Sequence, residues 1–306
     1  MTAWDPRALP ALAGRSYVVT GGAAGIGYFA AEQLAAAGAR VVIAARSPER
    51  AAHAIASIRA RVPDAELAHV RLDLASLASV REAAEELAGF RPLDALLNNA
   101  GRVVASRTRL ETVDGLEETV GVNFLGHFAL TARLFPALAP TGRVVGLGSD
   151  STRMVRLDAD DLWSQRRYAP FRAYALSKHA VQGFHLELAR RLAAAGDTRM
   201  SLLAHPGWST NVYASRRPGI TDRDAAGQRL VEALGGWIAQ GKDRGAWPEV
   251  RAAVDPDAVN GEYFGPRWML RGRPVRVQPV ASSADPGFGA ALWADAERRA
   301  GVGFGI

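Results

Sequence analysis

The sequence predicts a doubly wound α/β fold, in which helices cover both faces of a single parallel sheet. Short β-branched apolar runs alternate with longer helical segments from Arg15 to about Leu203, a pattern typical of a parallel sheet buried on both faces. A glycine-rich turn follows the first of these runs. Polar residues follow several of the later apolar runs, at the edge of the sheet where folds of this class bind ligands.

Strands and helices alternate along this part of the chain. The expected strands are Ser16 to Thr20, Arg40 to Ala44, Leu67 to Leu72, Leu93 to Leu97, Arg143 to Leu147 and Met200 to Ala204. The expected helices are Ile26 to Ala37, Pro48 to Arg61, Leu77 to Ala88, Leu116 to Leu138 and Phe171 to Ala195. Right-handed crossovers between parallel strands would join all of these strands into one sheet.

Two long segments interrupt the alternation. Asp150 to Pro170 is polar and delays the next helix, and the chain after Pro206 is rich in Gly and Trp, with one expected helix around Asp224 to Gln240. Long irregular segments in a compact domain are usually functional covers or disordered, and the tryptophans favour a cover here.

The composition excludes several classes of function. Cysteine is absent, which excludes disulfides and a cysteine nucleophile and fits a cytoplasmic protein. The histidines include no His-Glu-x-x-His spacing, so we assign no metal. The net charge of +6 comes from dispersed arginines, which argues against a nucleic-acid partner. We find no signal peptide and no apolar stretch of about eighteen residues, so we expect neither export nor a membrane span.

A glycine-rich turn opens the first expected helix. After Thr20 the chain reads Gly21-Gly22-Ala23-Ala24-Gly25-Ile26-Gly27, and the spacing of Gly21, Gly25 and Gly27 is a variant of the dinucleotide-binding pattern. Glycines there let backbone N–H groups and the helix N-terminus approach a pyrophosphate. A purely structural turn is the alternative. The position between first strand and first helix favours cofactor binding by Gly21, Ala24, Gly25, Ile26 and Gly27.

The end of the second strand predicts which dinucleotide binds. An acid there holds the ribose 2′-hydroxyl of NAD, whereas a cation suits the 2′-phosphate of NADP. The chain has Arg46 and Ser47 at this point and no acid before Glu49, which favours NADP (NADPH) over NAD. A surface role is the alternative for Arg46.

Two further strand ends are candidate parts of the cofactor site. Asp73, followed by Leu74, comes after the third strand, where the adenine should lie. Asn99, Ala100 and Gly101 end the fourth strand at the ligand-binding edge. Each segment is also open to a simpler interpretation as a turn.

Tyr174 and Lys178 are four residues apart in an expected helix and therefore share a face. The chain has only two lysines, Lys178 and Lys242, among 37 basic residues. A phenol has a pKa of about 10, and lowering that pKa to about 7 requires roughly 4 kcal/mol of stabilisation of the phenolate. One nearby cation supplies that energy at an effective dielectric constant of about 20. Tyr174 is thus a candidate general acid or base, and an aromatic side chain on the core face of an ordinary helix is the alternative. Tyr168 is followed by Arg172 instead, whose diffuse charge does not simply replace that of a lysine.

Together these motifs resemble the short-chain dehydrogenase/reductase family, in the order and spacing that the family uses. The motifs are Thr20 to Gly27, Asn98 to Gly101, Asn123, Ser149, and Tyr174 with Lys178, and the resemblance extends from about residue 14 to residue 264. The long interval from Ser149 to Tyr174, its Asp160-Asp161-Leu162 stretch and the segment from Ala44 to Glu49 look most similar to the branch that includes retinol dehydrogenases and protochlorophyllide reductases. That branch generally favours NADP.

The resemblance implies a catalytic tetrad of Asn123, Ser149, Tyr174 and Lys178. Tyr174 would exchange a proton with the substrate oxygen while a hydride moves to or from the nicotinamide. Lys178 would lower the phenol pKa and bind the nicotinamide ribose, and Ser149 would hold the substrate oxygen. Asn123 would support a water relay to Lys178 through a helix distortion. Ser151 is the alternative to Ser149.

The sequence as a whole predicts one Rossmann-fold domain over residues 1–306. Residues 14–205 would be the cofactor-binding and catalytic core, 206–260 a substrate-covering segment, and 261–306 the last strand and a C-terminal extension. Pro206, Gly207, Trp208 and Thr210 resemble the family segment at the nicotinamide amide, with Thr210 as the contact. The aromatic residues Trp208, Tyr213, Trp237 and Trp247 either line an apolar pocket or form the core of the cover.

The sequence therefore predicts an NADP-dependent oxidoreductase that transfers a hydride between the nicotinamide and a carbonyl or secondary alcohol of an apolar small molecule. Reduction of a carbon-carbon double bond is the alternative among enzymes, and a cofactor-sensing protein without catalysis is the alternative from another class. The C-terminal extension either covers the site or packs at a subunit interface of a homo-oligomer.

Overall fold

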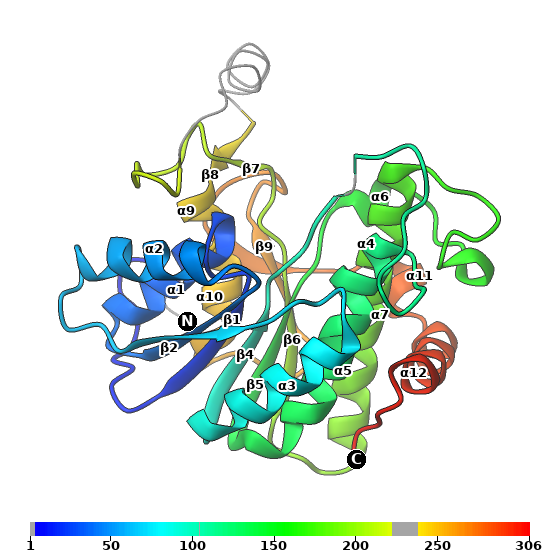
Figure 1. The fold of residues 1–306 in the computed structure, drawn as a ribbon, viewed down its shortest axis with the longest axis horizontal. Helices are drawn as coiled ribbons and strands as arrows, with labels where there is room; N and C mark the ends of the chain where they lie inside the picture. The colour runs from blue at the N-terminus through cyan, green and yellow to red at the C-terminus, as the bar shows by residue number, and fades with distance from the viewer. Residues whose placement is uncertain (1–3, 104, 222–237) are drawn as a thin grey trace.

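The computed structural model describes residues 4–103, 105–221 and 238–306, and its centre is an eight-stranded sheet (Figure 1). The strands lie in the order β10-β9-β6-β5-β4-β1-β2-β3. Their bounds are β1 Ser16–Thr20, β2 Arg40–Ala45, β3 Leu67–Arg71, β4 Leu93–Asn98, β5 Leu138–Leu147, β6 Met200–Ala204, β9 Tyr263–Pro266 and β10 Pro274–Val277. Only the pair β9 and β10 is antiparallel within this sheet, so the predicted doubly wound α/β fold is confirmed.

Helices cover both faces of the sheet (Figure 1). The longer ones are α1 Gly25–Ala36, α2 Pro48–Arg59, α3 Leu77–Leu87, α5 Gly126–Leu134, α7 Pro170–Ala194, α10 Trp247–Val254 and α12 Pro286–Ala300. Short helical elements are η1 Ala88–Phe90, α4 Glu118–Val120, α6 Ser151–Met154, η4 Ala159–Asp161, α9 Lys242–Gly245 and α11 Ala281–Ala284. A separate pair of short strands, β7 Ser209–Thr210 and β8 Gln240–Gly241, lies above the sheet beside α9. No helix of the described chain is both long and apolar enough to cross a membrane.

The two faces of the sheet bury separate apolar clusters. Along β1, Tyr17 and Val19 belong to one cluster and Val18 to the other, because successive side chains of a strand point to opposite faces. Helices α1, α2 and α10 complete the cluster that contains Tyr17, while α3, α5, α7 and α12 complete the other. This double burial explains why the strands have continuous apolar sequences.

The predicted strands are confirmed, but β5 begins at Leu138 rather than Arg143, because Leu138 already pairs with Leu93. The continuous helix predicted from Leu116 to Leu138 is wrong. The chain instead forms α4, a π-helical turn η2 Gly121–Leu125, α5, and a 3-10 turn η3 Phe135–Ala137 before β5. Residues 224–237 of the helix predicted up to Gln240, together with Trp237, lie outside the described residues, and Gln240 begins β8.

The C-terminal extension packs beside the sheet rather than above its carboxyl edge. Trp293 on α12 is 2% exposed, and its ring centre lies 5.3 Å from that of Phe128 on α5 and 5.9 Å from that of Phe184 on α7. Phe304 adds a ring 4.6 Å from Trp293. The extension therefore covers the outer surfaces of α5 and α7, which was one question that the sequence left open.

Candidate active site

The glycine turn, residues 21–27, joins β1 to α1. Gly21 and Gly25 have φ angles of 68° and 62°, in the left-handed region that favours glycine. A Cβ atom at Gly27 would lie 2.3 Å from Asn99 Nδ2, so the close approach of α1 to this side chain requires a glycine. No side chain caps α1 at Ala24, and the first N–H groups of a helix have no partner within it. The turn therefore presents donors for an anion.

Hydrogen bonds join segment 98–101 to the glycine turn. Asn99 Nδ2 donates to Thr20 O at 2.6 Å, and the N–H of Ala100 donates to Thr20 Oγ1 at 2.9 Å. The Nε2 atom of His127 lies 2.9 Å from the same hydroxyl. The structure thus brings two predicted cofactor-binding segments together where β1 and β4 end.

Tyr174 and Lys178 lie next to each other on α7. Lys178 Nζ is 5.8 Å from the centre of the Tyr174 ring and donates to Leu147 O at 2.6 Å. Leu147 ends β5, so this bond holds α7 against the strand that leads to Ser149. A Cβ atom at Gly101 would lie 3.6 Å from Lys178 Nζ. The predicted pair is therefore beside segment 98–101.

Burial raises the pKa of Tyr174 above its ordinary value of 10, and a side-chain hydrogen bond with Ser149 lowers it by less. The predicted lowering of this pKa by Lys178 is thus wrong for the protein alone. The prediction considered only the cation, whereas burial disfavours the phenolate. At neutral pH Tyr174 is consequently a neutral phenol that has a proton to give.

Glu249 on α10 is a buried acid near Lys178 that the sequence reasoning missed. It is 1% exposed, and burial raises its pKa to about 8 while Lys178 opposes the shift. Burial likewise lowers the pKa of Lys178 to about 8, and Glu249 opposes that shift. Each group therefore favours the charged form of the other. No fixed spacing links a glutamate after the sixth strand to Tyr174 and Lys178, so the sequence offers no signal for it.

Asn123 lies in the π-helical turn η2, in agreement with the expected helix distortion. Its Oδ1 accepts from the N–H of Arg102 at 2.8 Å, and its Nδ2 donates to Arg102 O and to Ser177 Oγ, both at 3.0 Å. The Asn123 carbonyl oxygen lies 3.0 Å from His127 Nδ1. Asn123 therefore ties segment 98–101 to α7 one residue before Lys178, and the water relay stays a prediction.

Of the two candidate serines, Ser149 is the one beside Tyr174. Its Oγ also accepts from the N–H of Ser151 at 3.1 Å, which fixes the start of α6. Ser151 is 5% exposed, and its hydroxyl has no hydrogen-bond partner within the described ranges. The geometry thus favours Ser149 over Ser151.

The residues predicted to bind the adenosine part of the cofactor lie at the ends of β2 and β3, but some of them already form hydrogen bonds within the protein. Arg46 is exposed immediately after β2, whereas Ser47 caps α2 by accepting from the N–H of Arg50 at 3.2 Å. Asp73 Oδ1 accepts from the N–H of Ala75 at 3.0 Å, which closes a turn after β3, and Leu74 is buried. Asp73 therefore has the turn role that was its alternative, and Ser47 is a helix cap; each keeps further oxygen lone pairs for a ligand.

Residues 206–210 leave β6 and turn toward β7. Gly207 has a φ of 63°, and a Cβ atom there would lie 2.3 Å from Leu270 O. The N–H of Trp208 donates to the same oxygen at 2.9 Å. Thr210 Oγ1 is buried without a hydrogen-bond partner in the described part of the chain. An orphaned hydroxyl at the predicted amide contact fits a polar ligand such as a nicotinamide.

The three described aromatic residues of the cover are not fully buried. Trp208 and Trp247 are half-buried, and Tyr213 is 37% exposed. Pocket lining therefore stays a prediction for these three residues.

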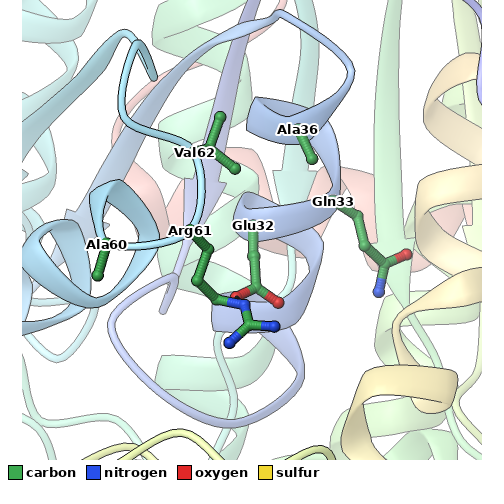
Figure 2. A pocket seen from close by; sticks show the side chains of 6 residues that line it. All are labelled: Glu32, Gln33, Ala36, Ala60, Arg61 and Val62. Carbon is green, nitrogen blue, oxygen red and sulfur yellow. Dashed lines mark ion pairs between the residues drawn. The ribbon is translucent and has the colours of Figure 1, made fainter.

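One pocket of about 480 Å³ lies away from this site, at the opposite end of α1 from the glycine turn. Glu32, Gln33 and Ala36 line one side of it, and residues 60–62 line the other (Figure 2). Glu32 is paired with Arg61 at 3.6 Å and with Arg217 at 2.7 Å, so its charge is already neutralised. We interpret this pocket as a surface hollow between α1 and α2. Within the described ranges no cluster of three or more His, Asp or Glu residues is placed to hold a metal.

Comparisons with known proteins identify the family. Residues 15–220 match the sequence profile described as short chain dehydrogenase. The chain is 40% identical to polyprenol dehydrogenase of Mus musculus, over 98% of this chain and 88% of the relative, and 34% identical to retinol dehydrogenase 13 of Homo sapiens, over 94% and 85%.

Two solved structures are also similar. An uncharacterized protein from Mycobacterium Paratuberculosis matches with a TM-score of 0.80 and 35% identity over the whole of both chains. A short chain dehydrogenase from Burkholderia cenocepacia, solved in complex with NADP, matches with a TM-score of 0.65 and 26% identity, over 86% of this chain and 98% of that one.

The chain therefore belongs to the short-chain dehydrogenase family and is an NAD(P)-dependent oxidoreductase. Its likeness to polyprenol and retinol dehydrogenases also confirms the predicted branch.

Proposed function

We propose that this enzyme uses NADPH to reduce the carbonyl group of an apolar substrate, with Tyr174 as the proton donor. The observation that carries the proposal is the placement of Tyr174 between Ser149 and Lys178, beside the segments that form the dinucleotide site. A bound nicotinamide supplies the hydride in this direction and accepts it in the reverse one.

The residues divide the work of handling the proton. The neutral Tyr174 phenol gives its proton to the substrate oxygen, and Ser149 holds that oxygen by a hydrogen bond. Lys178, whose pKa is about 8, holds positive charge near the phenolate that forms. In the reverse direction Tyr174 must first lose its proton. Because burial raises its pKa, alcohol oxidation should accelerate as the pH rises above neutrality.

Two observations support NADP as the cofactor. Arg46 is exposed immediately after β2, and the first acid that follows it, Glu49, accepts a hydrogen bond from Ser47 Oγ at 2.7 Å. The solved relative from Burkholderia cenocepacia contains NADP. An NAD-preferring enzyme would contradict this assignment.

The surroundings of Tyr174 support an apolar substrate. Phe171, one turn earlier on α7, is 46% exposed, and its ring centre lies 6.5 Å from that of Tyr174. Met154 on α6, which packs on α7, is 74% exposed. Relatives named for polyprenol and retinol act on apolar alcohols, and an apolar molecule would cover these side chains.

The test is a panel of short ketones, long-chain aldehydes and isoprenoid aldehydes, followed by NADPH absorbance with product analysis. We expect the alcohol as product, with long apolar aldehydes preferred. Tyr174→Phe should lower turnover about 10²- to 10⁴-fold while NADPH binding is kept. Tyr168→Phe is the matched control, because its hydroxyl donates to Ser106 O at 3.3 Å and, among the described residues, forms no other hydrogen bond; it should keep full turnover. Undiminished turnover by Tyr174→Phe, or a saturated carbon-carbon bond in the product, would contradict the proposal.

A further inference from the structure

We propose that Lys242 binds the diphosphate of the dinucleotide, so that the chain beyond β6 adds a charged side chain to the glycine turn. This inference rests on the dinucleotide site described above. It assigns to a lysine outside the recognised motifs a part in holding the cofactor.

The position of Lys242 is defined by its distance from the turn. Its Nζ lies 3.8 Å from the point that a Cβ atom would occupy at Gly25, and its Cδ lies 4.0 Å from the same point. Gly25 is the first residue of α1, whose uncapped N–H groups already favour an anion. An ammonium and the positive end of a helix repel each other unless a negative group lies between them. A diphosphate at this turn would satisfy both.

Backbone contacts hold Lys242 in this place. The preceding residue, Gly241, pairs with Thr210 across the two short strands. The following residue, Asp243, accepts a hydrogen bond through its carbonyl oxygen from Gln33 Nε2 on α1, at 2.9 Å. Helix α9 therefore lies against α1 in both Figure 1 and the contacts. These contacts fix the backbone position of Lys242 beside the start of α1.

Within the described residues, the positive charge of Lys242 has no negatively charged partner. Lys242 is half-buried, and no acid of the described residues pairs with it. The neighbouring Asp243 carboxylate instead accepts from Ser215 Oγ at 2.7 Å. Burial lowers the pKa of Lys242, and no charged partner opposes the shift. A desolvated cation without a counter-charge is what a site built for an anionic ligand presents before the ligand binds.

The choice of lysine is also informative, because the chain otherwise prefers arginine. Among 37 basic residues only Lys178 and Lys242 are lysines. A compact ammonium needs less room over a close backbone turn than the planar guanidinium of an arginine. Both lysines lie beside glycines of the predicted cofactor site, Lys178 beside Gly101 and Lys242 beside Gly25.

The experiment compares three ligands that carry different phosphates, with affinities measured by calorimetry. NADPH has both the diphosphate and the 2′-phosphate, ADP-ribose has only the diphosphate, and adenosine 2′-monophosphate has only the 2′-phosphate. Lys242→Met should weaken NADPH and ADP-ribose about 10- to 100-fold, the range of a hydrogen bond to a charged group, and leave adenosine 2′-monophosphate unchanged. Arg46→Ala is the matched control and should show the opposite pattern between the two fragments. Lys242→Arg should recover part of the lost affinity.

Two further measurements distinguish the role of Lys242 from the existence of the dinucleotide site itself. The melting temperature of ligand-free Lys242→Met should equal or exceed that of the wild type, because an unpaired charge is removed. Wild-type affinity of Lys242→Met for ADP-ribose, equal losses for all three ligands, or a lowered melting temperature would each overturn the inference. Failure of the wild-type protein to bind NADPH or NADH would overturn the dinucleotide site itself, which is a different result.

Discussion

Two buried histidines make the stability of this protein depend on pH near neutrality. His127 and His185 are 2% and 1% exposed, and burial lowers their pKa values to about 4 and about 3. Their rings bond inside the core, His127 to Thr20 Oγ1 and the Asn123 carbonyl, and His185 to Ser201 Oγ at 3.1 Å. Both side chains are therefore neutral when folded, whereas an unfolded histidine has a pKa of about 6.5.

The sign and size of the effect follow from proton linkage. Below pH 6.5 each of these histidines binds a proton in the unfolded chain but not in the folded protein, so its contribution to the free energy of unfolding falls as the pH falls. Between pH 7 and pH 5 each histidine should remove about 2 kcal/mol, and the two together about 4 kcal/mol. Glu249 acts in the opposite direction, because its pKa of about 8 in the folded protein exceeds the unfolded value; it should return about 2.5 kcal/mol over the same range, which leaves a smaller net fall. Burial also lowers the pKa values of His179 and His205, which adds to the loss. Asp161 and Asp197, whose pKa values lie below 3.8, take up protons only under more acidic conditions.

Urea unfolding at pH 7, 6 and 5 measures this dependence. His127→Gln should remove about half of the effect of the pair, or about 2 kcal/mol between pH 7 and pH 5. His53→Gln, which changes an exposed side chain on α2, should keep the full dependence. Because Glu249 offsets part of the wild-type dependence, the decisive comparison is between variants: a pH dependence of His127→Gln identical to that of the wild type would refute the reasoning.

Two further substitutions test the packing of the site and of the C-terminal extension. Gly27→Ala places a Cβ atom against Asn99 Nδ2, so it should abolish measurable NADPH binding and destabilise the fold by about 1–3 kcal/mol. The control Gly89→Ala, whose added Cβ atom would have no neighbour within 4 Å, should do neither. Calorimetry measures the binding and urea unfolding the stability, and NADPH binding by Gly27→Ala would contradict the close contact. Trp293→Ala should lower the free energy of unfolding by about 3–5 kcal/mol. Trp268→Ala, which changes a side chain that is 67% exposed, should alter it little. If urea unfolding shows equal losses for the two variants, the extension is not part of the core.

The elements that the sequence predicted well are those governed by local pattern. The strand Ser16–Thr20 agrees residue for residue, because a strand buried on both faces is a continuous apolar run with a glycine turn after it. The helix carrying Tyr174 and Lys178 was likewise predictable from spacing, since residues four apart meet on one face. These positions depend on near neighbours, which a sequence displays directly.

Long-range contacts account for what the sequence did not predict. The helix expected from Leu116 to Leu138 is interrupted at Asn123, whose side chain bonds to the backbone of Arg102 in another segment. The pKa of Tyr174 was predicted from one neighbour four residues away, but burial by the folded chain sets its direction. In both cases the deciding partner is distant in the chain.

The same distinction separates the chemistry of this enzyme from its tuning. The residues that carry the proposed reaction, Ser149, Tyr174 and Lys178, all lie within 15–220, the range that matches the family profile. Two titratable groups outside the motifs, Lys242 and Glu249, lie beyond that range, on the helices α9 and α10 that follow each other after β8. Lys242 lies beside the glycine turn, and Glu249, when ionised, favours the charged form of Lys178. Because α10 packs on β5 and β6 and α9 on α1, this single stretch places one titratable side chain beside each of these two parts of the predicted site. The motifs predict the proposed reaction, whereas the proposed contribution of this stretch follows only from its packing.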